Sequence, residues 1–294
     1  MSSEEFRDIS IGAKVGHFTI SKILGQGGFG LVAKAVDDQN HSLAIKFSDC
    51  FCEAMENEIE VLTALKDSAI VPEIFGSGAY KGYDFFTMEE MFGSLQDVLE
   101  MTGTKTFSAV VMQKILHQGI SSLKALHGYG FIHQDIKAAN LLLKAPRGPH
   151  NSTRIILGDM GLVASHADGK RVPDSICPAG CVPYATPAQK RGDVMTTWDD
   201  VIQLSYTPWS FQHLSIWNFL NSYSLEYKIG LLEDPNKHLP QALKWMLPFY
   251  SSIQESLLDS GVDYNVLTEA VQDMLRDTDG TDELRLIGGN ECLS

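Results

Sequence analysis

The sequence has few basic residues for its length. Its 294 residues contain 23 Lys and Arg against 37 Asp and Glu, which gives a formal net charge of −14, and the basic residues form no block. Because nucleic-acid binding depends on clustered Lys and Arg, no nucleic acid is expected as a main partner. Basic or neutral protein surfaces suit such a chain better.

Cysteines are also few, and long apolar runs are lacking. The cysteines are Cys50, Cys52, Cys177, Cys181 and Cys292. Their odd number and the absence of a metal-binding spacing predict free thiols in a reducing compartment and no zinc site. Apolar stretches such as QALKWMLPFY fall well short of the ~20 residues that a membrane helix needs, so no membrane segment is expected.

The first ten residues, MSSEEFRDIS, are acidic and polar. They lack the basic start and the apolar stretch of a signal peptide, and position 2 is not the Gly that myristoylation requires. We therefore expect synthesis in the cytosol and a cytoplasmic or nuclear location.

Glycines gather in the stretch LGQGGFGLVAKA, Leu24 to Ala35, where four of the six residues from 25 to 30 are Gly. Glycine costs conformational entropy and gives up packing, so such a cluster marks a tight turn or a close approach of backbone to a ligand. Backbone N–H groups exposed in this way can surround phosphate oxygens. An ordinary glycine-rich hairpin is the alternative that this stretch leaves open.

Periodic patterns divide the chain into a β-rich part and a helical part. HFTISKIL, LVAKAVD and SLAIKFSD, within residues 17–49, predict three strands, and residues 73–80 and 83–89 predict two more. CEAMENEIEVLTALKD, residues 52–67, has apolar residues at helical spacing. Helical patterns dominate from Gln96 onward and return in the aromatic-rich segments beyond residue 206, while KAPRGPHNST, residues 144–153, predicts a loop.

The glycine stretch is the first of four motifs. G-x-G-x-x-G-x-V, ending at Val32, is followed by LAIK ending at Lys46, by HQDIKAAN at 133–140 and by GDMG at 158–161. The same motifs occur in this order in protein kinases, which the sequence resembles over residues 17–205. The resemblance implies an α+β, two-lobed protein-kinase-like fold, with a small β-rich N-lobe containing one main helix and a larger, mostly helical C-lobe. It implies an N-terminal extension at 1–16 and a kinase domain at 17–290, with the N-lobe at 17–88, the hinge at 89–94 and the C-lobe at 95–290.

Phosphoryl transfer depends on positioning and charge neutralisation, so a kinase needs cations, metal ligands and a carboxylate near the acceptor hydroxyl. By resemblance, Lys46 holds the α- and β-phosphates of ATP, and Glu58 pairs with Lys46. The apolar face of the helix at 52–67 includes Ile59 and Leu62 and leaves Glu58 at its edge, which favours the pair over the alternative of a solvated helix carboxylate like Glu60. Asn140 and Asp159 are implied to bind Mg²⁺.

The resemblance also assigns Asp135 to accept or orient the proton of the substrate hydroxyl. Lys137, two residues further on, resembles the serine/threonine kinases, whereas tyrosine kinases typically carry an AAR variant in this loop. The implied substrate is therefore a protein with a Ser or Thr acceptor.

The adenine pocket is placed by the same resemblance. Val32 and Ala44 form its roof, Leu142 its floor and Met88 its back, and the hinge contributes the C=O of Glu89 and the N–H of Met91. The residues expected to contact ATP are Gly25, Gln26, Gly27, Gly28, Gly30, Val32, Ala44, Lys46, Met88, Glu89, Met91 and Leu142.

Four positions depart from the family pattern. Gln134 replaces the Arg of HRD, Met160 the Phe of DFG, Cys181 a Thr before the APE motif, and Ala188 the Glu of APE. Ala188 excludes the usual ion pair with a late Arg, so the platform for a protein substrate must differ. Asp200, in WDDVIQLSY, resembles the family Asp that holds the catalytic loop, and its surroundings are faintly similar to casein kinase one.

Three functions follow from these motifs. The first is an active ATP-dependent serine/threonine protein kinase, the second a pseudokinase that acts as a nucleotide-sensing scaffold, and the third a kinase of small molecules. The neutral amide of Gln134 cannot form the charged, bidentate contact that Arg makes with a phosphate on the activation loop. The sequence therefore predicts a constitutively competent kinase that is controlled by location, abundance or a regulatory partner. Lys170 or Arg171 is the alternative cation for such a phosphate.

Overall fold

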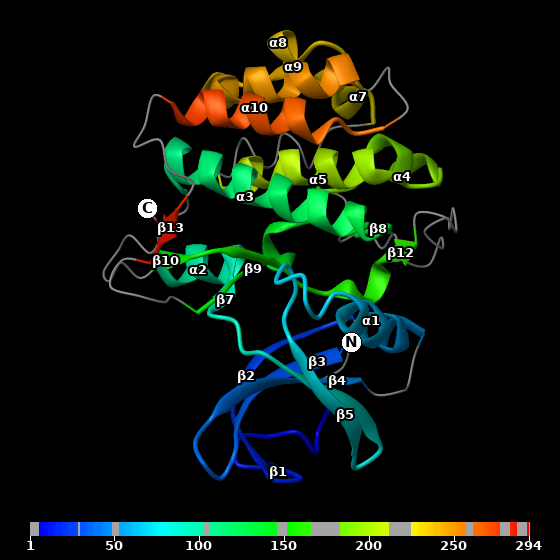
Figure 1. Cartoon of the computed structure of the whole chain (residues 1–294), viewed down its shortest axis with the longest axis vertical. Helices are drawn as coiled ribbons and strands as arrows, with labels where there is room; N and C mark the ends of the chain where they lie inside the picture. The colour runs from blue at the N-terminus through cyan, green and yellow to red at the C-terminus, as the bar shows by residue number, and fades with distance from the viewer. Residues whose placement is uncertain are drawn as a thin grey trace. The chain divides into compact units, whose positions relative to one another are not determined.

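The computed structural model describes residues 6–28, 30–48, 53–102, 106–145, 152–165, 183–211, 225–256, 261–276, 283–286 and 293. All five cysteines lie outside these residues, and so do Lys170 and Arg171. The chain forms two compact units, Met1–Phe92 with Ile156–Val163, and Gly93–Ile155 with Ala164–Ser294 (Figure 1). The first is β-rich and the second mostly helical, which confirms the expected α+β fold.

The first unit contains a six-stranded antiparallel sheet with the order β1-β2-β3-β4-β6-β5. Its elements are β1 (Lys14–Val15), β2 (Phe18–Gly27), β3 (Gly30–Val36), β4 (Ser42–Ser48), α1 (Glu53–Ala64), β5 (Ile74–Tyr80), β6 (Tyr83–Met88) and the 3-10 helix η2 (Met160–Leu162). Strands β2 to β6 and helix α1 lie where the sequence predicts them, to within a few residues, whereas β1 lies in the segment expected to be an N-terminal extension and was not predicted.

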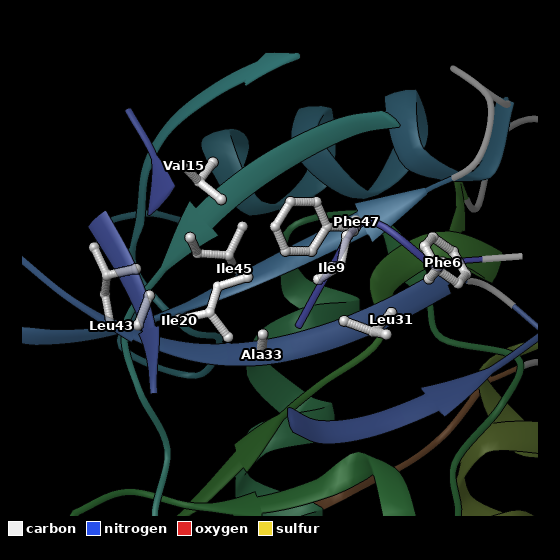
Figure 2. Packing of buried hydrophobic residues seen from close by; sticks show 10 residues of the cluster. Phe6, Ile9, Val15, Ile20, Leu31, Ala33, Leu43, Ile45 and Phe47 are labelled. Carbon is white, nitrogen blue, oxygen red and sulfur yellow. The ribbon is translucent and has the colours of Figure 1, made fainter. Parts of the chain in front are cut away.

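One face of this sheet carries the hydrophobic core of the first unit. Because side chains alternate along a strand, every second residue of β3 and β4 points to this face. Phe6 and Ile9, which precede the first strand, complete the same core (Figure 2). The buried members of the cluster are Phe6, Ile9, Val15, Ile20, Leu31, Ala33, Ala35, Leu43, Ile45 and Phe47.

The other face carries the candidate nucleotide residues. Val32 in β3 lies directly opposite Lys46 in β4, and Ala44 lies opposite Met88 in β6. Residues directly opposite one another share a face, and residues two apart on a strand do so as well. Val32, Ala44, Lys46 and Met88 therefore lie together on the face opposite the core, although the sequence separates them by more than fifty positions.

The glycine turn is shorter than the sequence predicts, because β2 continues to Gly27. Gly25 pairs with Val32, and Gly27 pairs with Gly30, so that only residues 28 and 29 join the strands. Gly30 has a φ of 124°, and a Cβ there would lie 2.0 Å from the backbone oxygen of Phe47. A side chain at Gly30 is excluded by the fold itself.

Replacing Gly30 with Ala is expected to lower the free energy of unfolding by at least about 2 kcal/mol, because strained φ and backbone overlap act together. Urea unfolding measures the change. Gly28→Ala in the same turn is the matched control, since a Cβ there meets nothing within 4 Å. We expect the control to change stability by less than about 0.5 kcal/mol. Equal losses in both variants would contradict this assignment.

The second unit is built mainly from helices (Figure 1). Its helices are α2 (Leu95–Thr102), α3 (Ala109–Gly128), η1 (Ala138–Asn140), α4 (Pro187–Arg191), α5 (Thr197–Ser210), α7 (Leu225–Glu233), α8 (Pro235–His238), η4 (Gln241–Met246), α9 (Leu247–Ser256) and α10 (Tyr264–Leu275). Its strands are β7 (Gly93–Ser94), β8 (Phe131–Ile132), β9 (Leu141–Leu143), β10 (Ser152–Thr153), β12 (Ala164–Ser165) and β13 (Leu284–Arg285), and β11 (Ile155–Leu157) runs from this unit into the first. Among the described residues, none of the helices is long and apolar enough to cross a membrane.

Polar side chains fix where several of these helices begin. Ser108 accepts a hydrogen bond from the N–H of Val111 at the start of α3. Thr196 and Asp199 form a capping box before α5, and Asp263 caps α10. Such caps satisfy N–H groups that the first helical turn leaves without partners.

The prediction of a loop at residues 144–153 is partly wrong. Residues 146–151 lie outside the described part of the chain, but Ser152 and Thr153 form the strand β10. Ser152 pairs with Arg285 and Thr153 with Leu284 of β13. The sequence hides this pairing because its partner lies some 130 residues away, and a pairing that distant leaves no local pattern.

Candidate active site

Three charged side chains meet in the first unit. The Lys46 Nζ atom lies 2.6 Å from Oε2 of Glu58 and 2.9 Å from Oδ1 of Asp159. The Lys46 and Glu58 side chains are 9% and 5% exposed, and that of Asp159 is 25% exposed. The alternative of a solvated Glu58 is therefore wrong.

The placement of Glu58 also corrects the expected helix face. The apolar residues of α1 predict Glu58 at the edge of the buried face, beside Ile59. In the structure Glu58 is buried together with Met55 and Leu62, whereas Ile59 is only half-buried. A hydrophobic pattern cannot reveal this, because the Lys46 ammonium is what permits a carboxylate to be buried there.

Burial and charge act against each other in this cluster. Burial alone would lower the pKa of Lys46, but the carboxylates of Glu58 and Asp159 raise it above its ordinary value. Burial raises the pKa of Glu58, and the nearby Lys46 ammonium opposes that rise. Lys46 is therefore a cation at neutral pH, held between two carboxylates.

Asp159 stands at the start of η2 in the left-handed backbone region, with φ 57° and ψ 72°. This conformation is uncommon for residues other than Gly, so neighbouring contacts must hold it. Asn57, next to Glu58 on α1, supplies such contacts. Its Nδ2 atom donates to the backbone oxygens of Met160, Gly161 and Val163 at 3.3, 3.2 and 2.8 Å.

Asn57→Ala is expected to lower the free energy of unfolding by about 1–2 kcal/mol and to speed amide hydrogen exchange at residues 159–163, because it removes the donor to three carbonyls. Thr63→Ala on the same helix is the control. The Thr63 hydroxyl donates to the backbone oxygen of Ile59 in an exposed position, so its loss should change neither quantity appreciably. Unchanged exchange in the Asn57 variant would contradict the assignment.

The remaining candidate nucleotide residues of the first unit lie on the sheet that carries Lys46, in its glycine turn or in the segment after β6. Gly25, Gln26, Gly27 and Gly28 are exposed, while Gly30 and Val32 are half-buried and Ala44 is buried. Met88 ends β6, and Glu89 and Met91 follow it, all three half-buried. A Cβ at Gly25, Gly27 or Gly28 would meet nothing within 4 Å.

These glycines are therefore not required by packing, in contrast to Gly30. Bare backbone at three exposed positions, a buried cation and an adjoining partly exposed carboxylate together suit a phosphate chain and its metal ion. The Lys46 ammonium, the Asp159 carboxylate and the bare glycine backbone of the first unit fit a nucleoside triphosphate with Mg²⁺.

The second unit contains the catalytic-loop residues. Asp135 Oδ2 accepts hydrogen bonds from Nζ of Lys137 at 2.7 Å and from Nδ2 of Asn140 at 3.0 Å. Asn140 also donates to the backbone oxygen of Asp135 at 2.8 Å. Asp135 and Asn140 are each 5% exposed. Leu142, the expected floor of the adenine pocket, follows in β9 and is half-buried.

Helix α5 holds the backbone of this loop from within the unit. Asp200 accepts hydrogen bonds from the N–H groups of His133 and Gln134 at 2.7 and 2.8 Å. Gln203 accepts from the N–H of Ile136 and donates to the backbone oxygen of Gln134, which has a φ of 69°. Asp200 is the anchoring residue, whereas Asp199 bonds to Thr196 and Thr186.

Several residues of this site were not found from the sequence. Asn57 and Gln203 form hydrogen bonds with backbone groups. Every residue has these groups, so such bonds require no particular partner residue and produce no sequence motif. Gln203 could have been found, because it lies three residues after Asp200 on the same helical face. Asn57 has no comparable signal.

Comparisons with known proteins agree with the geometry. A sequence model of the protein kinase domain matches residues 18–188, more than half of the chain. The chain therefore belongs to the protein kinase domain family.

Similar proteins carry kinase names. The protein named "Probable casein kinase I homolog" of Encephalitozoon cuniculi is 29% identical over 64% of this chain and 60% of its own length. Serine/threonine-protein kinase pakG of Dictyostelium discoideum is 37% identical over 52% of the chain and 13% of its own length. Casein kinase I homolog 3 of Schizosaccharomyces pombe is 28% identical over 52% and 35%. The chain thus spans three fifths or less of these relatives.

Proposed function

We propose that the chain is an ATP-dependent serine/threonine protein kinase that transfers the γ-phosphoryl group of ATP to a protein hydroxyl with Mg²⁺. The observation that carries the proposal is the Lys46 ammonium held by Glu58 and Asp159. Taking these three charged groups out of water is costly, and such clusters occur preferentially at functional sites, which supports a role for Lys46 in neutralising phosphate charge. The names of the relatives and Lys137 support the serine/threonine class.

Each unit contributes its own part of the chemistry. When bound, ATP would supply the phosphoryl group, and Mg²⁺ would supply positive charge that neutralises the phosphate oxygens. Lys46 would hold the α- and β-phosphates, the glycine turn would offer N–H groups, and Asp159 of the first unit and Asn140 of the second would be the metal ligands. Asp135 accepts the proton of the acceptor hydroxyl, and Lys137 and Asn140 hold its carboxylate in place.

Incubation of the purified chain with labelled ATP, Mg²⁺ and a degenerate peptide library tests the proposal. Label is expected on Ser and Thr but not on Tyr, and it should disappear when Mg²⁺ is chelated. A chain that binds ATP without labelling any peptide would be a nucleotide-sensing scaffold. Label on small molecules alone would place it among the small-molecule kinases.

A further inference from the structure

A buried lysine supports the backbone just before α4. Lys228, on α7, is 0% exposed, and its Nζ atom donates to the backbone oxygens of Pro183 at 2.7 Å and of Ala185 at 2.6 Å. The same Nζ atom lies 4.7 Å from the centre of the Tyr206 ring on α5. One side chain of α7 thus binds two alternate carbonyls of a segment some forty residues earlier in the chain.

The segment at 183–186 is anchored at further points. The Tyr184 hydroxyl accepts a hydrogen bond from the N–H of Ala138, in η1 beside the catalytic loop, at 3.3 Å. The Thr186 hydroxyl donates to Asp199 at 2.6 Å. The catalytic loop and this segment are therefore held to each other within the second unit.

Burying a lysine at this position carries a free-energy cost, because its amine loses contact with water. Burial lowers the pKa of Lys228 to about 7, and the charge of Lys190 on α4 contributes in the same direction. A Met of similar length would avoid that cost, so the position needs the N–H donors and not only the volume. Both the ammonium and the neutral amine have enough N–H groups for two carbonyls.

We propose that Lys228 is the positioning residue that fixes the backbone of residues 183–186, the platform for a protein substrate, in place of the carboxylate–guanidinium pair that Ala188 excludes. This proposal rests on the proposed kinase function. A side chain that binds backbone carbonyls can set the platform without a Glu at the start of α4.

Lys228→Met tests the proposal through peptide kinetics. It removes the donors but keeps the length, so we expect kcat/KM for a Ser/Thr peptide to fall between tenfold and a hundredfold, since small misplacements cost this much. The KM for ATP should stay within twofold, because no ATP-binding residue is changed. Lys237→Met on α8, at an exposed position, is the matched control and should change neither value. An unchanged peptide kcat/KM in the Lys228 variant would overturn the proposal.

Hydrogen exchange separates this proposal from the proposed function. Exchange of the amides at 183–192 should rise at least tenfold in Lys228→Met and stay unchanged in Lys237→Met, whether or not the chain phosphorylates anything. A wild-type chain without kinase activity would refute the function and leave this measurement to decide on the anchor. If Lys228→Met does not fold, Lys228→Gln decides, because its shorter side chain withdraws the N–H donors from the two carbonyls while keeping a polar end. A smaller change in the same direction supports the anchor, and unchanged exchange refutes it.

Discussion

Asp135→Asn is expected to lower kcat for peptide phosphorylation by about a thousandfold, the middle of the range for loss of a positioned general base. The substitution keeps the shape of the side chain, but the amide cannot accept a proton and faces the donors of Lys137 and Asn140. ATP-induced thermal stabilisation should remain, because the residues proposed to bind the nucleotide are unchanged. Steady-state kinetics with a labelled peptide and a thermal shift with ATP provide the two measurements.

Asp193→Asn is the control for this experiment. It makes the same chemical change in the second unit, at an exposed residue that pairs with the nearby Arg191. Its activity should equal that of the wild type. If Asp135→Asn retains more than a tenth of the wild-type rate, the proton acceptor is another group.

Lys46→Met should have two separate effects. Loss of the cation at the phosphates is expected to lower phosphorylation by at least about a hundredfold. Removal of one partner from a buried pair should also lower the free energy of unfolding by about 3 kcal/mol at pH 8, because the Glu58 charge is left uncompensated. Both quantities are measurable on the same preparation, by peptide kinetics and by urea unfolding.

The loss of stability in Lys46→Met should depend on pH. Without Lys46, burial raises the pKa of Glu58 further above its unfolded value, so the folded variant takes up a proton. Stability then falls as pH rises from the unfolded pKa to the folded pKa, and the deficit is smaller at pH 5 than at pH 8. The double variant Lys46→Met/Glu58→Gln removes the stranded charge and should recover stability but not activity. Recovery of activity would show that Lys46 serves only the fold.

The motif residues could be predicted because the chemistry demands particular side chains. A phosphate chain needs a cation and bare backbone, and a metal ion needs a carboxylate, so Lys46, Asp159 and the glycines recur at recognisable spacings. Strands β2 to β6 of the first unit were equally accessible, since their alternation is local, whereas the two-residue strand β1 is too short to show it. Both kinds of signal are carried by side chains close together in the sequence.

The features that escaped prediction depend on partners distant in sequence. Lys228 and Asn57 bind carbonyls, and any residue can supply a carbonyl. Glu58 was placed at the edge of its helix because apolar periodicity ignores the ion pair that buries it. The strand β10 pairs with β13, which lies far along the chain, and no local pattern near Ser152 indicates that partner.

Phe6 and Ile9 extend the folded core of the first unit beyond the residues that match the family model. That match begins at residue 18, yet these two side chains are buried in the core behind β3 and β4 at 7% and 6% exposure. A polypeptide that begins at residue 18 would leave that part of the core uncovered. Contiguous exposed apolar surface of this kind favours self-association. The unit that folds therefore includes residues that precede the match to the family model.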